Sequence, residues 1–249
     1  MPLLNNPRKE AACSLYQDNR HLRTCRFAST HLESTVLPLT PSAASTEQFV
    51  SLLEQLYQER SLITHPPAQS IPLKANYLYL VHRGIAQLHT IHPDGGESII
   101  GLCGPTMAFG HPLTQVDPYW ATALTEVDLL PLSLSEVEAS PALMAGLFPQ
   151  IIRRLQQTES WLSISGKRLV ADRLKCLLVQ MAQDFGQVSP QGVQLNVRLT
   201  HHQIATIICT TRVTVTRLLK EFRNEGWLDI CKRRIILSPE AANLICRQG

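Results

Sequence analysis

The spacing of apolar residues separates an aperiodic leading segment, a stretch of short strands and two helical stretches. Residues 1–44 mix Asn, Pro, Ser, Thr and Arg without a sustained repeat, which predicts a disordered or irregular arm. A short amphipathic helix is predicted from Thr46 to Glu59, because apolar residues recur there three or four positions apart, at Phe49, Leu52, Leu53 and Leu56.

Short apolar runs between residues 62 and 132 predict strands. Residues 77–81, 85–91 and 97–102 carry such runs, and His92–Gly96 (HPDGG) supplies hairpin-turn residues between the last two. Repeated short strands with Gly, Pro and Asp at their turns favour a small antiparallel barrel or roll.

A long helix is predicted to begin at Pro141. Residues on one of its faces recur every three or four positions, at Leu143, Leu147, Ile151, Leu155, Thr158, Leu162, Ser165 and Leu169. So long a stripe, with no second helix beside it in the sequence, favours a dimer seam, and an ordinary core-facing helix is the alternative. Gly166 can act as a hinge into a second helix over residues 167–184, which a predicted loop at 186–192 ends.

The stretch LTHHQIATIICTTRVTVTRLLKEFRNEG, residues 199–226, predicts two helices joined by a short turn. Thr200 and Gln203 match a capping box at the start of the first helix. The turn falls at Cys209–Thr211, where Thr211 can cap the second helix. This arrangement is that of a helix-turn-helix.

The second of these helices has an apolar stripe and an exposed basic face. The stripe comprises Val215, Leu218, Leu219 and Phe222. The residues expected to contact DNA lie on this helix and at the start of the first one, and they are Arg212, Val213, Thr216, Arg217, Lys220, Thr200 and His201. An Arg can donate two hydrogen bonds to guanine O6 and N7, and a Val or Thr methyl group can pack on the thymine methyl.

A basic hairpin follows this pair of helices. Apolar residues 227–230 and 234–237 flank Cys231, Lys232 and Arg233, which predicts a two-stranded wing. Lys232 and Arg233 at its tip are expected to contact phosphates. The C-terminal part is therefore predicted to be a winged helix-turn-helix that reads the major groove.

Charge is divided unequally along the chain. Residues 1–166 hold 10 basic and 14 acidic side chains, net −4, whereas residues 167–249 hold 13 and 6, net +7. This asymmetry favours a polyanionic partner for the C-terminal part alone, and double-stranded DNA fits it. No apolar run approaches the roughly 20 residues that cross a bilayer, and the N-terminus lacks the pattern of a secretory signal. We therefore expect a cytoplasmic protein with no membrane partner.

The cysteines and histidines show no pattern of a metal or cofactor site. The seven cysteines stand at irregular spacings without a C-x-x-C pair, so neither a zinc site nor a disulfide framework is predicted. An iron–sulfur cluster needs a clustered set of thiolates, which Cys13 and Cys25 do not supply. Haem sensing stays open as a non-specific alternative, through His82, His89, His92 or His111.

From residue 46 to its end, the chain resembles the Crp/Fnr family of bacterial transcription regulators, and within it the cyanobacterial nitrogen-control regulators. The resemblance rests on TRVTVTRLL at residues 211–219 and on RLQQTE at residues 154–159. It implies an α+β fold with an N-terminal antiparallel β-roll (a cyclic-nucleotide-binding-like jelly roll), a long dimerisation helix and a C-terminal winged helix-turn-helix. After the arm at residues 1–44, these three domains correspond to residues 45–140, 141–166 and 167–249.

The resemblance also implies a homodimer that reads a palindromic site of the type GTA…TAC and works with RNA polymerase. An effector can bind between the roll and the long helix, and the corresponding positions here are Phe109, Gly110, His111, Arg154 and Glu159. Of these, Arg154 and Glu159 match the helix pair that contacts 2-oxoglutarate in the nitrogen-control regulators.

Three positions depart from the family pattern. Cys209 begins the turn where the family usually has Gly. Members that bind cAMP carry Gly-Glu and then Arg-Ser in the roll, whereas no Arg stands here between residues 84 and 152, so cAMP is not expected. The roll Arg that helps to hold 2-oxoglutarate corresponds to Asp117, which would repel a dicarboxylate.

The predicted function is therefore that of a homodimeric, sequence-specific DNA-binding regulator, without enzymatic activity, metal or cofactor. Two other classes stay open. An adaptor could keep this fold and present the basic helix to an acidic protein. A cupin-like metalloenzyme would need two His and a Glu on one metal, but His89 and His92 are expected on opposite faces of a strand end.

Overall fold

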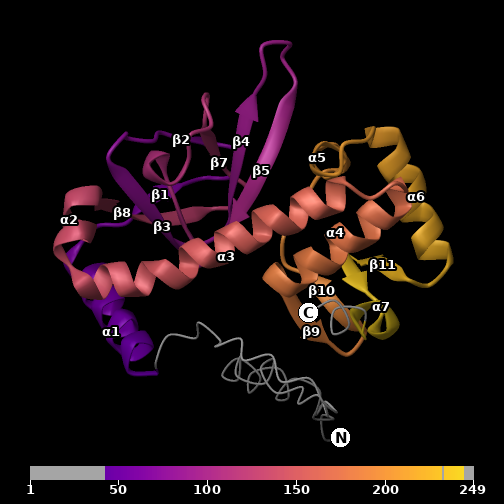
Figure 1. Ribbon diagram of the computed structural model, residues 1–249. Helices are drawn as coiled ribbons and strands as arrows, with labels where there is room; N and C mark the ends of the chain where they lie inside the picture. The colour runs from indigo at the N-terminus through magenta and orange to yellow at the C-terminus, as the bar shows by residue number, and fades with distance from the viewer. Residues whose placement is uncertain (1–42, 232, 244–249) are drawn as a thin grey trace, which may run out of the picture. The chain divides into compact units, whose positions relative to one another are not determined.

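The structure is a computed structural model that describes residues 43–231 and 233–243 (Figure 1). These residues belong to one compact unit, Thr40–Gly249. The predicted arm at residues 1–44 lies outside the described residues, apart from its last two, which begin a helix.

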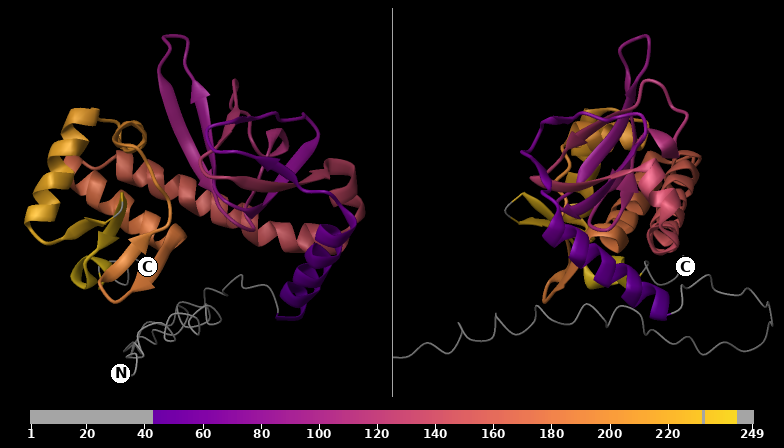
Figure 2. Two further views of the ribbon diagram at one scale, coloured as in Figure 1. Left: turned by 180° about the vertical axis from the view of Figure 1, so that it is seen from behind. Right: turned by 90° about the vertical axis from the view of Figure 1, so that its left-hand side faces the viewer.

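Two four-stranded antiparallel sheets form a β-roll (Figures 1 and 2). The first sheet has the order β1-β8-β3-β6, formed by Ile63–His65, Val127–Ser133, Tyr77–Arg83 and Ala108–Phe109. The second has the order β2-β7-β4-β5, formed by Ser70–Ile71, Trp120–Ala123, Ala86–Ile91 and Glu97–Cys103. Strands β3, β4 and β5 confirm the three strands predicted from the apolar runs.

The HPDGG turn closes the β4–β5 hairpin, which projects from the roll in all views of Figures 1 and 2. The N–H of His92 donates to the carbonyl oxygen of Gly96 at 2.7 Å. Gly95 has a φ of 81°, a conformation that glycine adopts without the penalty of a Cβ. The predicted hairpin turn is therefore confirmed.

Both faces of β3 are buried, which explains why its apolar run does not alternate with polar residues. Tyr79 and Val81 point between the two sheets, whereas Leu78 and Leu80 pack against helices. Side chains alternate between the faces of a strand, so each face needs its own apolar partner. The apolar partner of the Leu78 and Leu80 face consists of three helices: α1 (Ala43–Glu59), α2 (Leu134–Ala139) and the first half of α3 (Pro141–Ser165).

Helix α1 confirms the predicted amphipathic helix and begins three residues earlier. Its Phe49, Leu53 and Leu56 are buried against the roll and α3. At Gly146 of α3, a Cβ would lie 1.8 Å from a ring carbon of Phe49. Glycine at this position therefore permits the close contact between the two helices.

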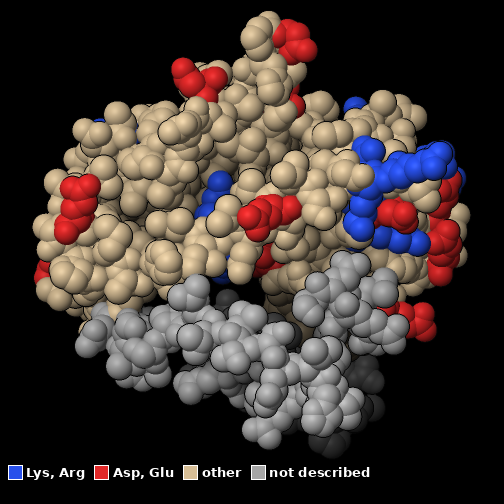
Figure 3. All heavy atoms as spheres, in the orientation of Figure 1, with Lys and Arg blue, Asp and Glu red and all other residues tan. Residues whose placement is uncertain are grey.

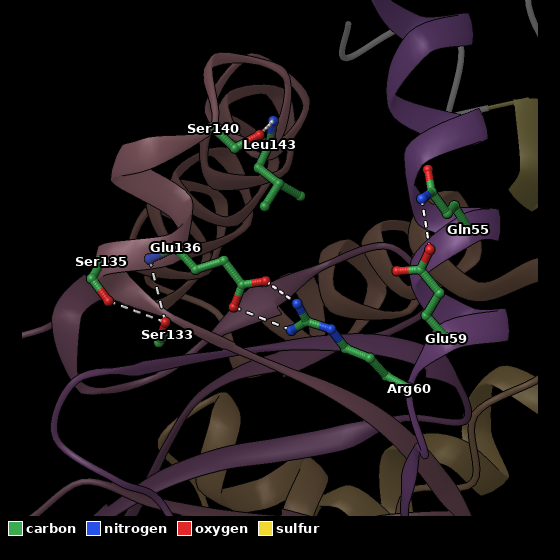
Figure 4. A network of polar contacts seen from close by, with 8 residues as sticks. All are labelled: Gln55, Glu59, Arg60, Ser133, Ser135, Glu136, Ser140 and Leu143. Carbon is green, nitrogen blue, oxygen red and sulfur yellow. Dashed lines mark hydrogen bonds and ion pairs between the residues drawn. The ribbon is translucent and has the colours of Figure 1, made fainter.

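An ion pair and two serine caps fix the ends of these helices (Figure 4). The guanidinium of Arg60, just after α1, donates two hydrogen bonds to the Glu136 carboxylate in the first turn of α2. These bonds lower the pKa of Glu136. Ser133 and Ser140 accept from the backbone N–H groups of Glu136 and Leu143 at 3.3 Å, and so cap α2 and α3.

The predicted stripe on α3 divides into a covered and an uncovered part. Leu143 and Leu147 are buried in the cluster beneath the first sheet. Leu155 and Leu162, in contrast, are 57% and 74% exposed. The predicted dimer seam is therefore wrong for Leu143 and Leu147, because α1 and the roll already cover them. It is also wrong for Leu169, which lies beyond the end of α3 as the N-cap of α4.

Gln157 joins α3 to the roll and to the next helix, α4 (Val170–Phe185). It is 2% exposed. Its Oε1 accepts from the N–H of Leu102 in β5 at 3.0 Å, and its Nε2 donates to Asp184 Oδ2 at 3.2 Å. A buried amide whose two ends are both bonded sets the relative position of the three elements.

The C-terminal part combines helices with a third antiparallel sheet of order β11-β12-β10-β9. After α4 its elements are β9 (Gly186–Ser189), β10 (Gly192–Leu195), α5 (His201–Ile207), α6 (Arg212–Asn224), β11 (Leu228–Cys231), β12 (Arg234–Leu237) and α7 (Pro239–Asn243). The loop predicted at residues 186–192 is instead the β9–β10 hairpin. Its polar sequence concealed the strands, because their pairing with β12 depends on residues some 40 positions away. Among the described helices, none is long and apolar enough to cross a membrane.

The roll packs directly against α5. Ile99 and Leu102 of β5 share one buried cluster with Trp161 of α3 and with apolar residues of α4, α5 and α6. Beside this cluster, Gln203 Nε2 of α5 donates to Gln87 Oε1 of β4 at 2.7 Å. The roll therefore contacts the predicted helix-turn-helix through both apolar and polar side chains.

Replacing Gln157 with Met is expected to lower the free energy of unfolding by about 1–3 kcal/mol, because the buried N–H of Leu102 then lacks an acceptor. Gln156→Met, at the exposed neighbouring position, is the matched control and should change it by less than about 0.5 kcal/mol. Urea unfolding followed by tryptophan fluorescence measures both. Equal stabilities of the two variants would contradict the role given to Gln157.

Candidate nucleic-acid interface

Helix α5 begins at the capping box that the sequence predicts. Thr200 Oγ1 accepts from the N–H of Gln203 at 3.1 Å, and Gln203 Oε1 accepts from the N–H of Thr200 at 2.8 Å. These bonds satisfy backbone groups that have no partner within the helix. The start of α5 is thus well defined, and with it the positions of Thr200 and His201.

The turn between α5 and α6 contains a residue in the left-handed region. Cys209 has a φ of 52°, and the N–H of Thr210 donates to the carbonyl oxygen of Ala205 at 2.9 Å. Arg173 of α4 donates to the carbonyl oxygens of Ile208 and Cys209 at 3.2 and 3.4 Å. Sequence reasoning missed Arg173, since no local pattern links it to a turn 35 positions away.

Helix α6 has the buried and exposed faces that the sequence predicts. The buried residues are Val215, Leu218, Leu219 and Phe222. The five predicted contact residues of α6 are not buried, and they are Arg212, Val213, Thr216, Arg217 and Lys220. Val213 is 78% exposed, which leaves its methyl groups free to pack on a thymine methyl.

The polar side chains of α6 are held by weak surface contacts. Arg217 Nη1 lies 2.6 Å from Glu221 Oε1, one helical turn further on, and both side chains are largely exposed. Thr211 Oγ1 caps the helix by accepting from the N–H of Thr214 at 3.2 Å. An exposed ion pair contributes little free energy, so a guanine can replace Glu221 as the partner of Arg217 at small cost.

Strands β11 and β12 form the predicted wing. Cys231 pairs with Arg234 at its tip, and Arg233 is exposed with a φ of 64°. Lys232, the other residue expected to contact phosphates, lies outside the described residues. The Arg234 guanidinium donates to Asn196 Oδ1 at 3.2 Å, which ties the wing to the segment after β10.

Basic side chains gather over this part of the fold on the face drawn in Figure 3. The Lys and Arg atoms visible there lie over α6 and over the junction of α3 and α4. A cavity of about 520 Å³ at that junction is lined in part by Lys167, Arg168 and Lys175. Such a surface attracts a polyanion along several adjacent elements.

Comparison with known proteins identifies this arrangement. Residues 172–242 match the family model of the Crp-like helix-turn-helix domain. The chain is 34% identical over 170 residues to the regulatory protein CysR of Synechococcus elongatus, with 67% of this chain and 79% of that protein covered. It is 31% identical over 178 residues to the global nitrogen regulator of a Synechocystis strain, with 68% and 79% covered. The chain belongs to the Crp/Fnr family.

The fold is also that of solved Crp/Fnr proteins. A CRP-family transcriptional regulator from Thermus thermophilus superposes with a TM-score of 0.63 at 20% identity, over 75% of this chain and 97% of that one. The α+β class with a β-roll, a long helix and a winged helix-turn-helix is therefore confirmed. Membership of the family makes the protein a DNA-binding transcription regulator.

Three of the effector positions implied by the family surround Tyr119 in the roll. Phe109 belongs to the same buried cluster as Tyr119, and the backbone of Gly110 is hydrogen-bonded to the Tyr119 side chain. The ring centroids of His111 and Tyr119 lie 5.7 Å apart. Burial raises the pKa of Tyr119, and the charge of Arg154 opposes this rise. The roll interior is thus filled by side chains around these positions.

Arg154 and Glu159, the two implied positions on α3, lie apart. A Cβ at Gly101 of β5 would lie 1.9 Å from Arg154 Nη1, so Arg154 faces the roll. Glu159 is exposed and lines a cavity of about 360 Å³ between α3 and α4. Residues five positions apart on a helix are rotated about 140° beyond one full turn relative to each other. Arg154 and Glu159 of one subunit therefore point in different directions.

The described residues give no support to the metalloenzyme alternative. Within residues 43–231 and 233–243, no three His, Cys, Asp or Glu side chains are placed to hold a metal ion. His89 is half-buried, its Nδ1 lies 4.0 Å from Glu97 Oε1, and burial lowers its pKa. Cys13 and Cys25, weighed for an iron–sulfur cluster, lie outside the described residues.

Replacing Cys209 with Gly, the residue usual in the family, is expected to raise the free energy of unfolding by about 1 kcal/mol. The left-handed conformation costs an L-residue about 1–2 kcal/mol, a cost that glycine avoids. Part of this gain is lost, because glycine also gives the unfolded chain more conformational freedom. Cys209→Ala is the matched control, because it removes the thiol but keeps the Cβ. Urea unfolding compares them, and an equal gain in both variants would show that the thiol, not the backbone, was the cause.

Proposed function

We propose that the protein is a homodimeric transcription regulator that reads a palindromic site, of the type GTA…TAC, in the major groove. The observation that carries the proposal is the exposed face of α6. Arg212, Val213 and Arg217 project from its first turns, while its opposite stripe is buried. This leaves two guanidinium groups and one apolar side chain free for base edges. The proposal includes a cytoplasmic site of action and a contact with RNA polymerase.

Contacts to phosphate are proposed to come from other residues than the three that read the bases. Thr200, His201, Thr216 and Lys220 flank the base-reading residues, and Arg233 stands at the tip of the wing with Lys232 beside it in the sequence. Such contacts set the register on the duplex and carry no sequence information. We assign five of these six residues to the DNA backbone. Thr216, whose hydroxyl hydrogen is donated to the carbonyl oxygen of Arg212, is assigned to apolar contact through its methyl group.

The proposed dimer forms through the uncovered part of α3. Phe148, Leu155 and Leu162 follow one another on α3 at intervals of seven residues, and all three are more than half exposed. A repeat of seven is the spacing at which apolar residues of two helices meet in a coiled coil. The domains proposed on this basis are the roll at residues 45–140, the dimerisation helix at 141–166 and the DNA-binding domain at 167–249.

An effector, where one acts, would bind at Phe109, Gly110, His111 and Arg154, with Glu159 supplied by the partner subunit. One guanidinium reaches this part of the roll, and no Arg stands between residues 84 and 152. The position that holds a further Arg in the nitrogen-control regulators is Asp117 here, whose carboxylate would repel a dicarboxylate. The proposed site therefore suits a ligand less anionic than 2-oxoglutarate.

Selection of bound sequences from random DNA, with and without candidate metabolites, is the test that separates this function from the adaptor alternative. A regulator enriches one palindromic motif, with half-sites about one helical turn, roughly 34 Å, apart. An adaptor that uses α6 on an acidic protein enriches none.

Replacing Arg217 with Ala should weaken binding to the selected site by about 1–3 kcal/mol and relax base preference there, because a bidentate contact to guanine is lost. Arg233→Ala is the matched variant for backbone contact. It should weaken selected and random DNA alike and lower the slope of log affinity against log salt by about one unit per subunit. Fluorescence anisotropy measures both. An equal loss on the two DNAs for Arg217→Ala would contradict base reading.

Replacing Leu162 with Glu should convert the dimer to monomers, because it places a charge in the centre of the proposed apolar seam. Ser163→Glu introduces the same charge at the next position, which is also exposed but lies off the stripe, and should leave the dimer intact. Sedimentation equilibrium gives the mass of each. A dimeric Leu162→Glu variant would overturn the assignment of α3 as the dimer helix.

A further inference from the structure

His201 contacts the recognition helix α6 through a hydrogen bond that determines which of its ring nitrogens carries hydrogen. His201 Nδ1 lies 2.8 Å from Thr216 Oγ1. Thr216 donates its hydroxyl hydrogen to the carbonyl oxygen of Arg212 at 2.9 Å. A hydroxyl has a single hydrogen, so Thr216 must accept from the ring. Nδ1 of His201 therefore carries the hydrogen.

The other ring nitrogen, Nε2, then determines what His201 can bind. Among the residues that the structure describes, Nε2 has no hydrogen-bond partner. In the neutral ring with hydrogen on Nδ1, it bears a lone pair and can only accept. A phosphate oxygen is also an acceptor, so the two can pair only when Nε2 is protonated. Protonation of the ring converts an unfavourable contact into a charge-assisted hydrogen bond.

The surroundings of His201 favour an anion as its partner. The charged groups that share the Thr216 face of α6 are Arg212 and Lys220, one helical turn to either side. Its own segment contributes Arg198 and His202. On the roll side of α5, the carboxylate of Glu97 in β5 accepts from Gln87 at 3.1 Å. A protonated ring near Arg212, Lys220 and Arg198 needs added negative charge, which DNA phosphates supply.

We propose that His201 is a proton-dependent phosphate contact. When DNA binds, each subunit takes up one proton at Nε2, so affinity for DNA rises as the pH falls. The proposal rests on the proposed function and adds to it a dependence on pH that the other assigned contacts, Arg, Lys and Thr, do not have.

The test is the affinity of the full-length protein for a duplex carrying its selected site, measured by fluorescence anisotropy between about pH 6 and about pH 8. We expect the affinity for this duplex to rise about tenfold per subunit from the higher to the lower pH, because one charge-assisted hydrogen bond is gained in each subunit. The slope of log affinity against log salt should also be steeper by about one unit per subunit at the lower pH.

Three variants separate this role from a structural one. His201→Asn keeps an amide donor at the position of Nδ1 and removes Nε2, so it should abolish the pH dependence. His202→Asn, at the exposed neighbouring histidine, is the matched control and should retain it. Thr216→Val removes the acceptor that fixes the tautomer, so the neutral ring can place its hydrogen on Nε2 and the pH dependence should shrink.

The outcomes distinguish this proposal from the proposed function. Specific binding by the wild type that does not change with pH would overturn the role of His201 and leave DNA reading intact. The role of His201 would also be overturned if His201→Asn kept the wild-type pH dependence, or if the slopes of log affinity against log salt agreed at both pH values. Failure to select any DNA motif at either pH would overturn both proposals together.

Discussion

A shared hydrophobic core joins the roll, the long helix and the DNA-binding part, and the position of the recognition helix depends on it. Leu102 of β5, Trp161 of α3 and Leu219 of α6 belong to the same buried cluster. Apolar packing is non-directional, so it holds these elements together without determining their angles. Two side-chain amides at its edge add direction: the buried Gln157 bonds β5 and α4, and the partly buried Gln203 bonds β4. Since Gln203 is also half of the capping box, the roll is one hydrogen bond away from the start of α5.

This connection limits how the roll can influence DNA binding. The interior of the roll is filled by its own side chains, among them Phe109 and Tyr119. A ligand that enters must displace packed atoms, and close-packed interiors transmit such displacements. The neighbouring strand β5 carries Leu102, whose N–H bonds Gln157, and Gly101, against which Arg154 packs. Any shift of β5 would therefore move α3, and the effect would reach α6 through the shared core.

Local sequence signals predicted much of the fold and of the interface. The capping box of Thr200 and the two faces of α6 each depend on residues within one or two helical turns. Contacts that join distant segments were not predictable in this way. Gln157 and Arg173 look like ordinary helical polar residues, and only the fold brings them to Leu102 and to the turn before α6. The β9–β10 hairpin was misread for the same reason, because its strands need β12 as a partner.

The division of the α3 stripe has a consequence for the proposed dimer. The first half of the helix is buried in its own subunit, so the seam can form only from about Phe148 onward. The exposed residues of the seam end at Leu162, in the last turn of α3 before its junction with α4. A small rotation of one α3 against its mate would then move the two recognition helices by a larger amount, because each is carried at the end of the seam. Half-sites about one helical turn apart tolerate little such movement. The angle between the two α3 helices is therefore the quantity through which any signal, whether a ligand in the roll or the DNA itself, would act.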